Sequence, residues 1–256
     1  MGCGRISVCY EDAFRRLSDH VELICAIDTD LEKAKAFAQK FNCHYCTDLE
    51  DALQYDIDVI HLCLPHYLHP AMAIKAMEAG LHVLTEKPVA ISLQDADKMI
   101  ETQQRTGRKL GVIFQTRYTK SVEILKGLIG SGYFGRILSA RSCLTWNRPD
   151  TYYSGNDWKG TWDKEGGGVL IDQAIHSMDR VRYMLGSEIE WIEGSIHNHC
   201  HEIVQVEDAA EAAIQFKNGC IYSLYACNSY ASDAPITIEF QGEKGCCGLI
   251  QDMGFY

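Results

Sequence analysis

Apolar and polar residues alternate along the first 116 residues with two periodicities. Short apolar runs, typical of buried strands, lie at residues 21–28, 58–65, 81–88 and 109–117. Apolar positions three to four residues apart predict intervening helices at residues 6–17, 31–41, 48–53, 68–79 and 92–105. Short joints between these segments predict an α/β fold with a parallel, doubly wound sheet of Rossmann type.

Capping residues indicate where several of these helices begin and end. Thr47 and Glu50 have the spacing of a capping box before the helix at 48–53. Ser92 is the expected cap of the helix at 92–105, and Gly80 follows the end of the helix at 68–79.

The pattern changes after residue 116. Helices are expected at 119–130 and 169–185, and Asn218-Gly219 predicts a hairpin turn between two strands. Strand-like segments lie at residues 136–146, 188–197, 208–228 and 235–242. This half is expected to be an α+β domain with an open, mainly antiparallel sheet.

A glycine-rich turn opens the chain. Gly2, Gly4 and Ser7 follow the pattern G-x-G-x-x-G with serine in the last place, which lets the backbone approach a pyrophosphate at a helix N-terminus. Asp28 closes the strand-like run 21–28, where an acid holds the ribose hydroxyls of a dinucleotide. A turn or helix cap is the alternative role for Asp28, and Asp30 is better placed to cap.

The same turn indicates which dinucleotide is bound. Thr29 follows Asp28, and no arginine stands there to accept a 2′-phosphate, so NAD is favoured over NADP. A buried strand should precede such a turn, and only Met1 does. We therefore expect a sheet that lacks its first strand, as a start site placed too far downstream, a truncated gene or a fragment would give.

Composition and charge restrict the function classes. The formal net charge is −11 and no basic block stands out, which argues against nucleic acid as a partner. No apolar run is long enough to span a membrane, and no signal peptide is recognised, so we expect a cytoplasmic protein. The 12 cysteines are then expected as reduced thiols, and neither Cys43–Cys46 nor His197–His201 completes a metal site.

Two further segments carry polar residues at chemically informative spacing. Glu86, Lys87 and Pro88 end a predicted strand. The segment 166–179 holds three glycines followed by Asp172 and His176, which share a helix face at spacing i, i+4.

Together GCGRIS, LPHYLH, EKP and GGGVLIDQAIHSMD resemble the Gfo/Idh/MocA oxidoreductase family, which includes glucose–fructose oxidoreductase and inositol dehydrogenase. The motifs occur in the family's order over nearly the whole chain. His66 stands where many members carry asparagine, and members usually continue beyond Tyr256, so both ends are expected to be clipped. The resemblance implies a dinucleotide-binding domain at 1–116 and a substrate-binding and oligomerisation domain at 117–256.

The resemblance also implies a reaction. Hydride passes between a secondary hydroxyl of a sugar, sugar derivative or cyclitol and the nicotinamide. His176 would be the acid/base, since histidine titrates near neutral pH. Asp172 would orient His176 or bind a substrate hydroxyl, and Lys87 would bind the reacting oxygen. The alternatives are a helix histidine paired with Asp172, a helix-face acid and a solvated lysine.

Cofactor contacts implied by the resemblance gather at the ends of the predicted strands. They are Gly2, Gly4, Arg5, Ile6, Asp28, Leu64, Pro65, His66, His69, Glu86 and Lys87. His69 has capping of its helix as an alternative role.

Substrate contacts are expected mainly from a segment rich in Trp, Tyr and Asn at 145–168, because aromatic faces beside polar groups suit a polyhydroxylated ring. The candidates are Arg117, Trp146, Arg148, Tyr152, Tyr153, Trp158 and Lys159, with Asp172 and His176. Packing within the domain or on a partner subunit is the alternative for this segment, and a structural salt bridge is the alternative for Arg117.

Assembly and two competing functions complete the predictions. The family commonly forms dimers through the exposed face of the second sheet, so a homodimer or homotetramer is expected. An NAD-dependent glycosidase, or a non-catalytic regulator that binds sugar or nucleotide, are the alternatives to a dehydrogenase.

Overall fold

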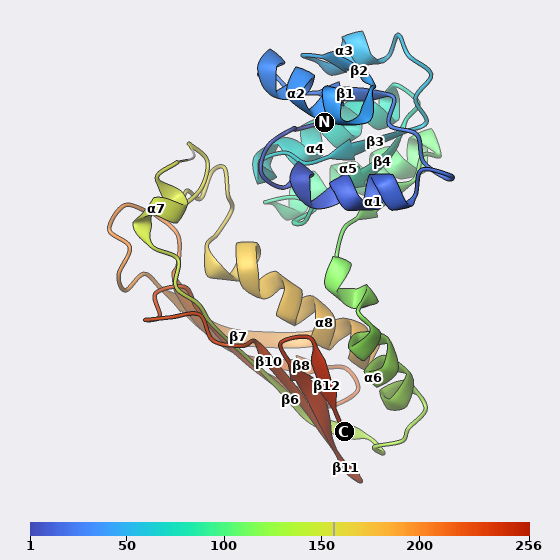
Figure 1. Ribbon diagram of the computed structural model, residues 1–256. Coiled ribbons are helices and arrows are strands. Elements are labelled where there is room, and N and C mark those ends of the chain that lie inside the picture. The colour runs from blue at the N-terminus through green and yellow to red at the C-terminus, as the bar shows by residue number, and fades with distance from the viewer. Residues whose placement is uncertain (156) are drawn as a thin grey trace. The chain divides into compact units, whose positions relative to one another are not determined.

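The computed structural model describes residues 1–155 and 157–256 and divides into two compact units. The first unit is Met1–Ile113 and the second is Phe114–Tyr256 (Figure 1). Each unit has its own hydrophobic core and is described by itself.

The first unit is a parallel α/β structure, which confirms the Rossmann-type prediction. Strand β1 (Cys25–Ile27) pairs with β2 (His44–Cys46), and β3 (Val59–Leu62), β4 (His82–Thr85) and β5 (Leu110–Val112) form a second parallel group. The helices between them are η1 (Ser7–Tyr10), α1 (Glu11–Arg16), α2 (Leu31–Phe41), α3 (Leu49–Ala52), η2 (His66–Leu68), α4 (His69–Glu78) and α5 (Leu93–Thr106).

The first two residues bridge these two groups of strands. The Met1 ammonium donates to the His61 carbonyl at 2.7 Å, and the Cys63 N–H donates to the Met1 carbonyl at 2.8 Å. On the other side, the Gly2 N–H donates to the Ile27 carbonyl at 2.8 Å. Within residues 1–155 and 157–256 no strand lies between β1 and β3.

Helix caps follow the sequence with one exception. Asp30 caps α2 by accepting from Glu32 and Lys33, and Ser92 caps α5. The prediction for α3 was wrong: Asp48, not Thr47, is the cap and accepts from the Asp51 N–H at 2.8 Å. A carboxylate one residue later competes successfully for the same free donors at the start of the helix.

The core of the first unit lies between the three-stranded group and its helices. Leu62 and Val83 of β3 and β4 pack with Met77 of α4 and Met99 of α5. Burying each such side chain stabilises the fold by roughly 1.5–3 kcal/mol. This core fixes the carboxyl ends of the strands, where the candidate cofactor residues lie.

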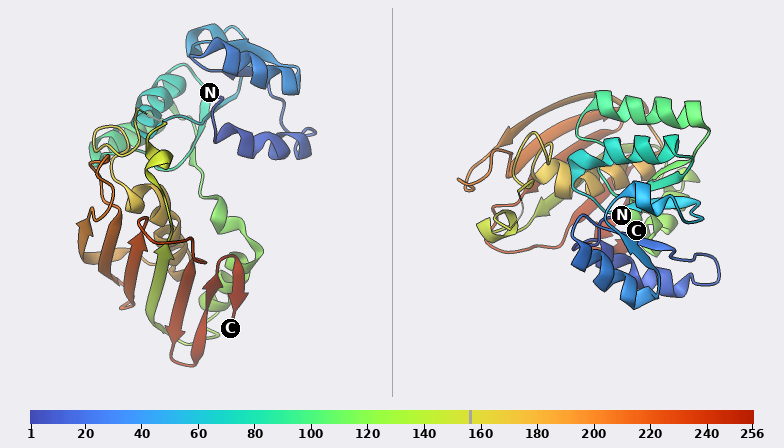
Figure 2. Two further views of the ribbon diagram at one scale, coloured as in Figure 1. Left: turned by 60° about the vertical axis from the view of Figure 1, so that its left-hand side comes forward. Right: turned by 90° about the horizontal axis from the view of Figure 1, so that it is seen from above.

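The second unit is a seven-stranded sheet in the order β12-β11-β10-β6-β9-β8-β7, antiparallel except for the parallel pair β6–β9 (Figure 2). The strands are β6 (Ile137–Thr145), β7 (Ile189–His197), β8 (Ala209–Phe216), β9 (Ile221–Cys227), β10 (Thr237–Gly242), β11 (Gly245–Ile250) and β12 (Met253–Phe255). The mainly antiparallel prediction is confirmed.

Helices cover one face of this sheet. They are α6 (Lys120–Gly130) and α8 (Ile175–Leu185). The unit also contains the shorter η3 (Gln115–Tyr118), α7 (Asp150–Tyr153) and the π-helical turn η4 (Leu170–Ala174). Leu125 of α6 and Val181 of α8 pack against sheet residues such as Tyr222 and Phe240. The segment 169–185, expected to be one helix, begins with the wider π turn η4 and continues as α8. Asp172 lies in the π turn and not in the regular α-helix.

Candidate active site

The candidate cofactor residues of the first unit lie at one edge of its sheet. Backbone hydrogen bonds join the segments that follow β1, β3 and β4: Gly2 to Ile27, Cys63 to Met1, and Glu86 to Leu62 at 3.1 Å. Carboxyl ends of parallel strands are where open α/β sheets bind ligands.

Gly2 and Gly4 give the first turn its shape. Gly2 has φ +87°, and a Cβ there would stand 2.3 Å from the Cys63 carbonyl oxygen. Gly4 has no atom within 4 Å of the corresponding position, so its backbone stays open to a ligand. The Ser7 hydroxyl donates to the Gly4 carbonyl at 2.7 Å and closes the turn. Such an open, glycine-lined cradle fits a dinucleotide pyrophosphate.

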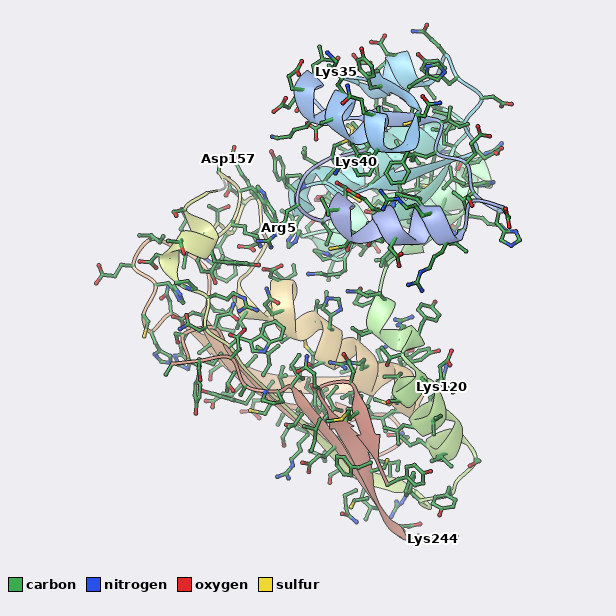
Figure 3. All side chains as sticks on the ribbon, in the orientation of Figure 1. Arg5, Lys35, Lys40, Lys120, Asp157 and Lys244 are labelled. Carbon is green, nitrogen blue, oxygen red and sulfur yellow. The ribbon has the colours of Figure 1, made fainter. Side chains whose placement is uncertain are left out.

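Asp28 joins this turn to the end of β1. Its Oδ2 accepts from the Cys3 N–H at 2.8 Å, and its Oδ1 accepts from the Asp30 N–H at 2.9 Å. Asp30, and not Asp28, caps α2. Arg5 and Ile6 are exposed on the turn (Figure 3).

His69 braces two of the loops. It is fully buried, with Nδ1 2.7 Å from the Pro88 carbonyl and Nε2 2.9 Å from the Leu64 carbonyl. It makes no side-chain cap on α4, so the capping alternative was wrong. Burial lowers the pKa of His69.

Glu86 and Lys87 follow the end of β4. The buried Glu86 carboxylate accepts from the hydroxyl of Tyr10, and Lys87 is partly buried beside it. The peptide bond between Lys87 and Pro88 is cis. Burial and the neighbouring Glu86 raise the pKa of Tyr10, which therefore remains a hydrogen-bond donor. No sequence pattern had identified Tyr10, because this contact joins residues 76 positions apart.

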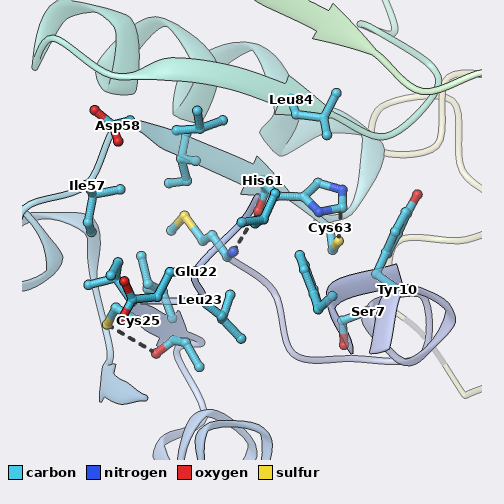
Figure 4. Close-up of a pocket in the computed structure, with 18 of the residues that line it drawn as sticks. Ser7, Tyr10, Glu22, Leu23, Cys25, Ile57, Asp58, His61, Cys63 and Leu84 are labelled. Atoms are coloured by element: carbon cyan, nitrogen blue, oxygen red, sulfur yellow. Dashed lines mark hydrogen bonds between the residues drawn. The ribbon is translucent and has the colours of Figure 1, made fainter. Parts of the chain in front are cut away.

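A cavity of about 760 Å³ lies beside the turn, between β1 and β3 (Figure 4). Its polar members include His61 and Cys63, among mainly apolar residues such as Leu23 and Leu84. Burial lowers the pKa of His61 to about 4 and raises that of Cys63 to about 12. Both groups are thus neutral near pH 7, although Glu22 and Asp58 also line the cavity.

In the second unit, Gly167 and Gly168 bring the start of η4 against Glu207, which precedes β8. A Cβ on Gly168 would stand 1.9 Å from the Glu207 carbonyl oxygen. That carbonyl accepts from the Val169 N–H at 3.0 Å. The Glu207 carboxylate accepts from Gly168 at 2.9 Å and Leu170 at 3.1 Å. Glu207, which sequence reasoning missed, thereby satisfies the free donors that begin the helix.

Asp172 projects from η4 into a polar cluster. Its Oδ2 accepts from the Tyr152 hydroxyl at 2.6 Å, from Lys159 Nζ at 2.8 Å and from Gln173 Nε2 at 3.0 Å. Lys159 also lies 3.2 Å from Oε1 of the buried Glu165. Burial opposes the charge of Lys159, but Asp172 and the other anionic groups outweigh it and raise its pKa.

His176 stands in the first turn of α8, four residues after Asp172. Its ring meets the edge of Phe114, with the two centroids 6.1 Å apart. A π turn is rare, and it commonly occurs at functional sites.

Comparison with known proteins identifies both domains. Residues 1–114 match the family described as "Oxidoreductase family, NAD-binding Rossmann fold", and residues 122–247 match the "GFO/IDH/MocA C-terminal domain". The chain belongs to the Gfo/Idh/MocA oxidoreductase family.

Individual relatives share both domains. The WlbA dehydrogenase of Bordetella pertussis, solved with NADH and UDP-GlcNAcA, is 30% identical and superimposes with a TM-score of 0.92 over 96% of this chain and 75% of that one. D-glucoside 3-dehydrogenase of Escherichia coli is 27% identical over 95% of this chain and 74% of its own length. Glucose-6-phosphate 3-dehydrogenase of Bacillus subtilis is 28% identical over 95% of this chain and 71% of its own length.

The chain is shorter than these Gfo/Idh/MocA relatives. It spans between 46% and 74% of the length of four of the curated proteins that it matches. Within the described residues, no helix combines the length and apolar character needed to cross a membrane. No group of three or more His, Cys, Asp or Glu side chains among residues 1–155 and 157–256 is arranged to hold a metal ion.

Two other residues expected to contact the substrate, Arg117 and Tyr153, make contacts within the second unit. Arg117 forms a two-pronged ion pair with Asp179, with Nε 2.7 Å from Oδ2, as expected of the salt bridge that is its alternative role. Tyr153 is buried with Val204 and Val206 and belongs to a small core cluster.

The segment around Trp146 is held by polar contacts and ring stacking. Trp146 Nε1 donates to the Ala234 carbonyl at 3.2 Å. The guanidinium of Arg148 lies 4.4 Å from the centroid of Trp146 and pairs with Asp233. Trp158 lies beside the Lys159 ammonium, with 4.7 Å between the ring centroid and Nζ. Sequence reasoning missed Glu165 and Gln173, since only the fold brings them to Asp172.

Proposed function

We propose that this chain oxidises or reduces a secondary ring hydroxyl of a sugar, sugar derivative or cyclitol with NAD as hydride carrier. The observation that carries the proposal is the Asp172 cluster. It presents a fixed carboxylate on the π turn that leads directly into His176, in a family whose first domain binds NAD.

The first unit supplies a suitable cofactor site. Gly2 lets the turn pack against Cys63, Gly4 leaves room for a pyrophosphate, and Asp28 stands at the strand end where ribose hydroxyls are held. NAD, when bound, supplies the acceptor or donor of hydride. Leu64, Pro65, His66 and Glu86 complete the proposed cofactor contacts, with Arg5, Ile6, His69 and Lys87.

The chain's own residues handle the proton. In the oxidation direction, a ring nitrogen of His176 accepts the hydroxyl proton while the hydride leaves the same carbon. Lys87 stabilises the developing charge on the oxygen, and Asp172 orients His176 or the substrate hydroxyl. In the reduction direction the same groups act in reverse.

The relatives support a ring hydroxyl as the reacting group. Two of them are named for dehydrogenation at position 3 of a glucoside or of glucose 6-phosphate, and the WlbA structure contains NADH. Trp146, Arg148 and Trp158, with Tyr152, are the proposed contacts of the ring, because they combine aromatic faces with polar groups on one segment.

We further propose a cytoplasmic homodimer or homotetramer that associates through the open face of the seven-stranded sheet. The 12 cysteines are free thiols, which suits a reducing compartment. Along β9, Tyr222 and Leu224 are buried against the helices while Ile221 and Tyr225 are exposed on the opposite face. Light scattering of the wild type and of Tyr225→Glu tests this: the proposed oligomer should weaken in the variant, and a monomeric wild type would contradict it.

Absorbance of NADH tests the activity. The purified chain is incubated with NAD and a panel of methyl glucosides, glucose 6-phosphate and myo-inositol. NADH should form with at least one ring substrate, and Lys87→Met should abolish it. If the folded protein binds NADH but produces no NADH from NAD with any substrate of the panel, the proposal is contradicted. Cleavage of a glycoside without net formation of NADH would also contradict it.

A further inference from the structure

The ammonium of Lys159 is buried between two carboxylates. Its side chain is 5% exposed, that of Glu165 is 1% exposed, and that of Asp172 is 11% exposed. Nζ lies 2.8 Å from Asp172 Oδ2, 3.2 Å from Glu165 Oε1 and 3.1 Å from the Tyr152 hydroxyl. A lysine that meets substrate would not need two anions of the protein around its charge.

The surrounding loop is folded so that this charge stays inside. The Gly160 N–H donates to Glu165, and the Gly160 carbonyl accepts from Gln205 at 2.7 Å. Gly160 has φ +76°, and a Cβ there would stand 2.6 Å from a side-chain carbon of Val204. The loop is thus tied to the rest of the unit directly after Lys159, which restrains the position of the ammonium.

Three donors converge on one oxygen of Asp172. Tyr152, Lys159 and Gln173 all donate to Oδ2, so rotation of the carboxylate is restricted and its ionised form is favoured. Lys159 is the only one of these three that also brings a positive charge. Among the described residues, the charged and titratable side chains that act on Lys159 are Asp172 on η4, Glu165 on the loop and Tyr152 on α7.

We propose that Lys159 is a positioning residue, which holds Asp172 ionised and in one orientation, and that Glu165 anchors Lys159 from the other side. Lys159 does not itself bind the substrate. This inference rests on the proposed function only in giving Asp172 a role in the reaction.

Removing the ammonium has a definite electrostatic consequence. In Lys159→Met, Asp172 and Glu165 remain close together in a buried site without a cation. Two carboxylates in such a site cannot both stay ionised, so one takes up a proton at higher pH than before. Lys159→Arg keeps the charge, and Tyr152→Phe removes one neutral donor but leaves the ion pair.

The kinetic test uses these variants with Lys164→Met as a matched control, since Lys164 lies on the same loop and contacts Asp157 instead of Asp172. With the substrate found above, Lys159→Met should lower kcat by about 100-fold and change KM little. The acid limb of its pH profile should move up by about one to three pH units. Lys159→Arg should return the acid limb to its wild-type position. Tyr152→Phe should lower kcat less than Lys159→Met does, and Lys164→Met should behave as the wild type.

Two kinetic results would overturn the inference. A raised KM with unchanged kcat would make Lys159 a substrate contact. A lower melting temperature and lower kcat with an unmoved acid limb would make it purely structural.

A titration without substrate separates this inference from the proposed function. Protein labelled with ¹³C at the aspartate carboxyl groups is titrated by NMR, and the Asp172 signal is assigned by its loss in Asp172→Asn. The midpoint of that signal should rise by about one to three pH units in Lys159→Met and stay in place in Lys164→Met. An unmoved midpoint in Lys159→Met would refute the positioning role, whether or not any sugar is oxidised.

Discussion

Gly168 and Glu207 are in direct backbone contact: the Glu207 carbonyl oxygen lies 1.9 Å from the place where a Cβ on Gly168 would stand. The same carbonyl accepts from Val169, and the Glu207 carboxylate accepts from Gly168 and Leu170. The start of the helix that carries Asp172 and His176 is therefore fixed by a contact that only glycine permits.

Gly168→Ala is expected to destabilise the second unit by about 1–3 kcal/mol, because backbone on both sides has to shift. Urea unfolding followed by circular dichroism measures this. Gly127→Ala is the matched control: Gly127 lies in α6 with no atom within 4 Å of the Cβ position. It should be neutral or stabilising by about 0.5–1 kcal/mol. Equal effects of the two substitutions would refute the contact.

Gly2 and Gly4 should respond differently to alanine. Gly2→Ala is expected to lower both stability and NADH affinity, since its Cβ would collide with the Cys63 carbonyl at a left-handed φ. Gly4→Ala has room in the fold, so it should leave the urea midpoint unchanged and weaken NADH binding only. Fluorescence titration with NADH measures the affinities. Unchanged affinity in Gly4→Ala would place the pyrophosphate elsewhere.

The buried His61 predicts acid sensitivity. Burial, assisted by the Met1 ammonium, lowers the pKa of His61 from 6.5 to about 4. Between these values the unfolded chain binds a proton that the folded protein does not, so stability falls as pH is lowered from about 6.5 to 4. His61→Gln should flatten the pH dependence of the unfolding free energy in this window. If the unfolding free energy of His61→Gln depends on pH as steeply as that of the wild type, the prediction is wrong.

His176→Ala is expected to lower turnover by about 100- to 10,000-fold, because general acid–base catalysis contributes that much. NADH affinity should remain nearly unchanged, since the cofactor contacts proposed above lie in the first unit. Steady-state rates and the NADH titration together measure both effects. Turnover that survives the substitution would exclude His176 as the acid/base.

Much of the fold could be predicted from local sequence. The helix at 31–41 matches α2 because apolar spacing, the Asp30 cap and the left-handed Asn42 all act within the segment. The run 21–28 gave only the three-residue strand β1, since pairing partners and not apolar character decide where a strand begins. β11 and β12 were not predicted, because their glycines and cysteines carry little alternation.

The site was predictable to a lesser extent. Motifs predicted Asp172 and His176 as site residues, but no motif predicted the π turn Leu170–Ala174 that carries Asp172. Lys159 was expected to contact substrate, whereas the fold buries it between Glu165 and Asp172. Partners brought together by tertiary structure leave no periodic signal in the sequence.

The fate of one hydrogen atom tests the central claim most directly. A methyl glucoside carrying deuterium at carbon 3 is incubated with the chain and NAD, and the reduced cofactor is analysed by mass spectrometry. Direct hydride transfer predicts NADH that contains one deuterium, with faster turnover of the unlabelled sugar. If NADH forms without deuterium from glucosides labelled at each secondary ring carbon in turn, or if the label appears in water, the chain does not act as a sugar dehydrogenase in the way proposed.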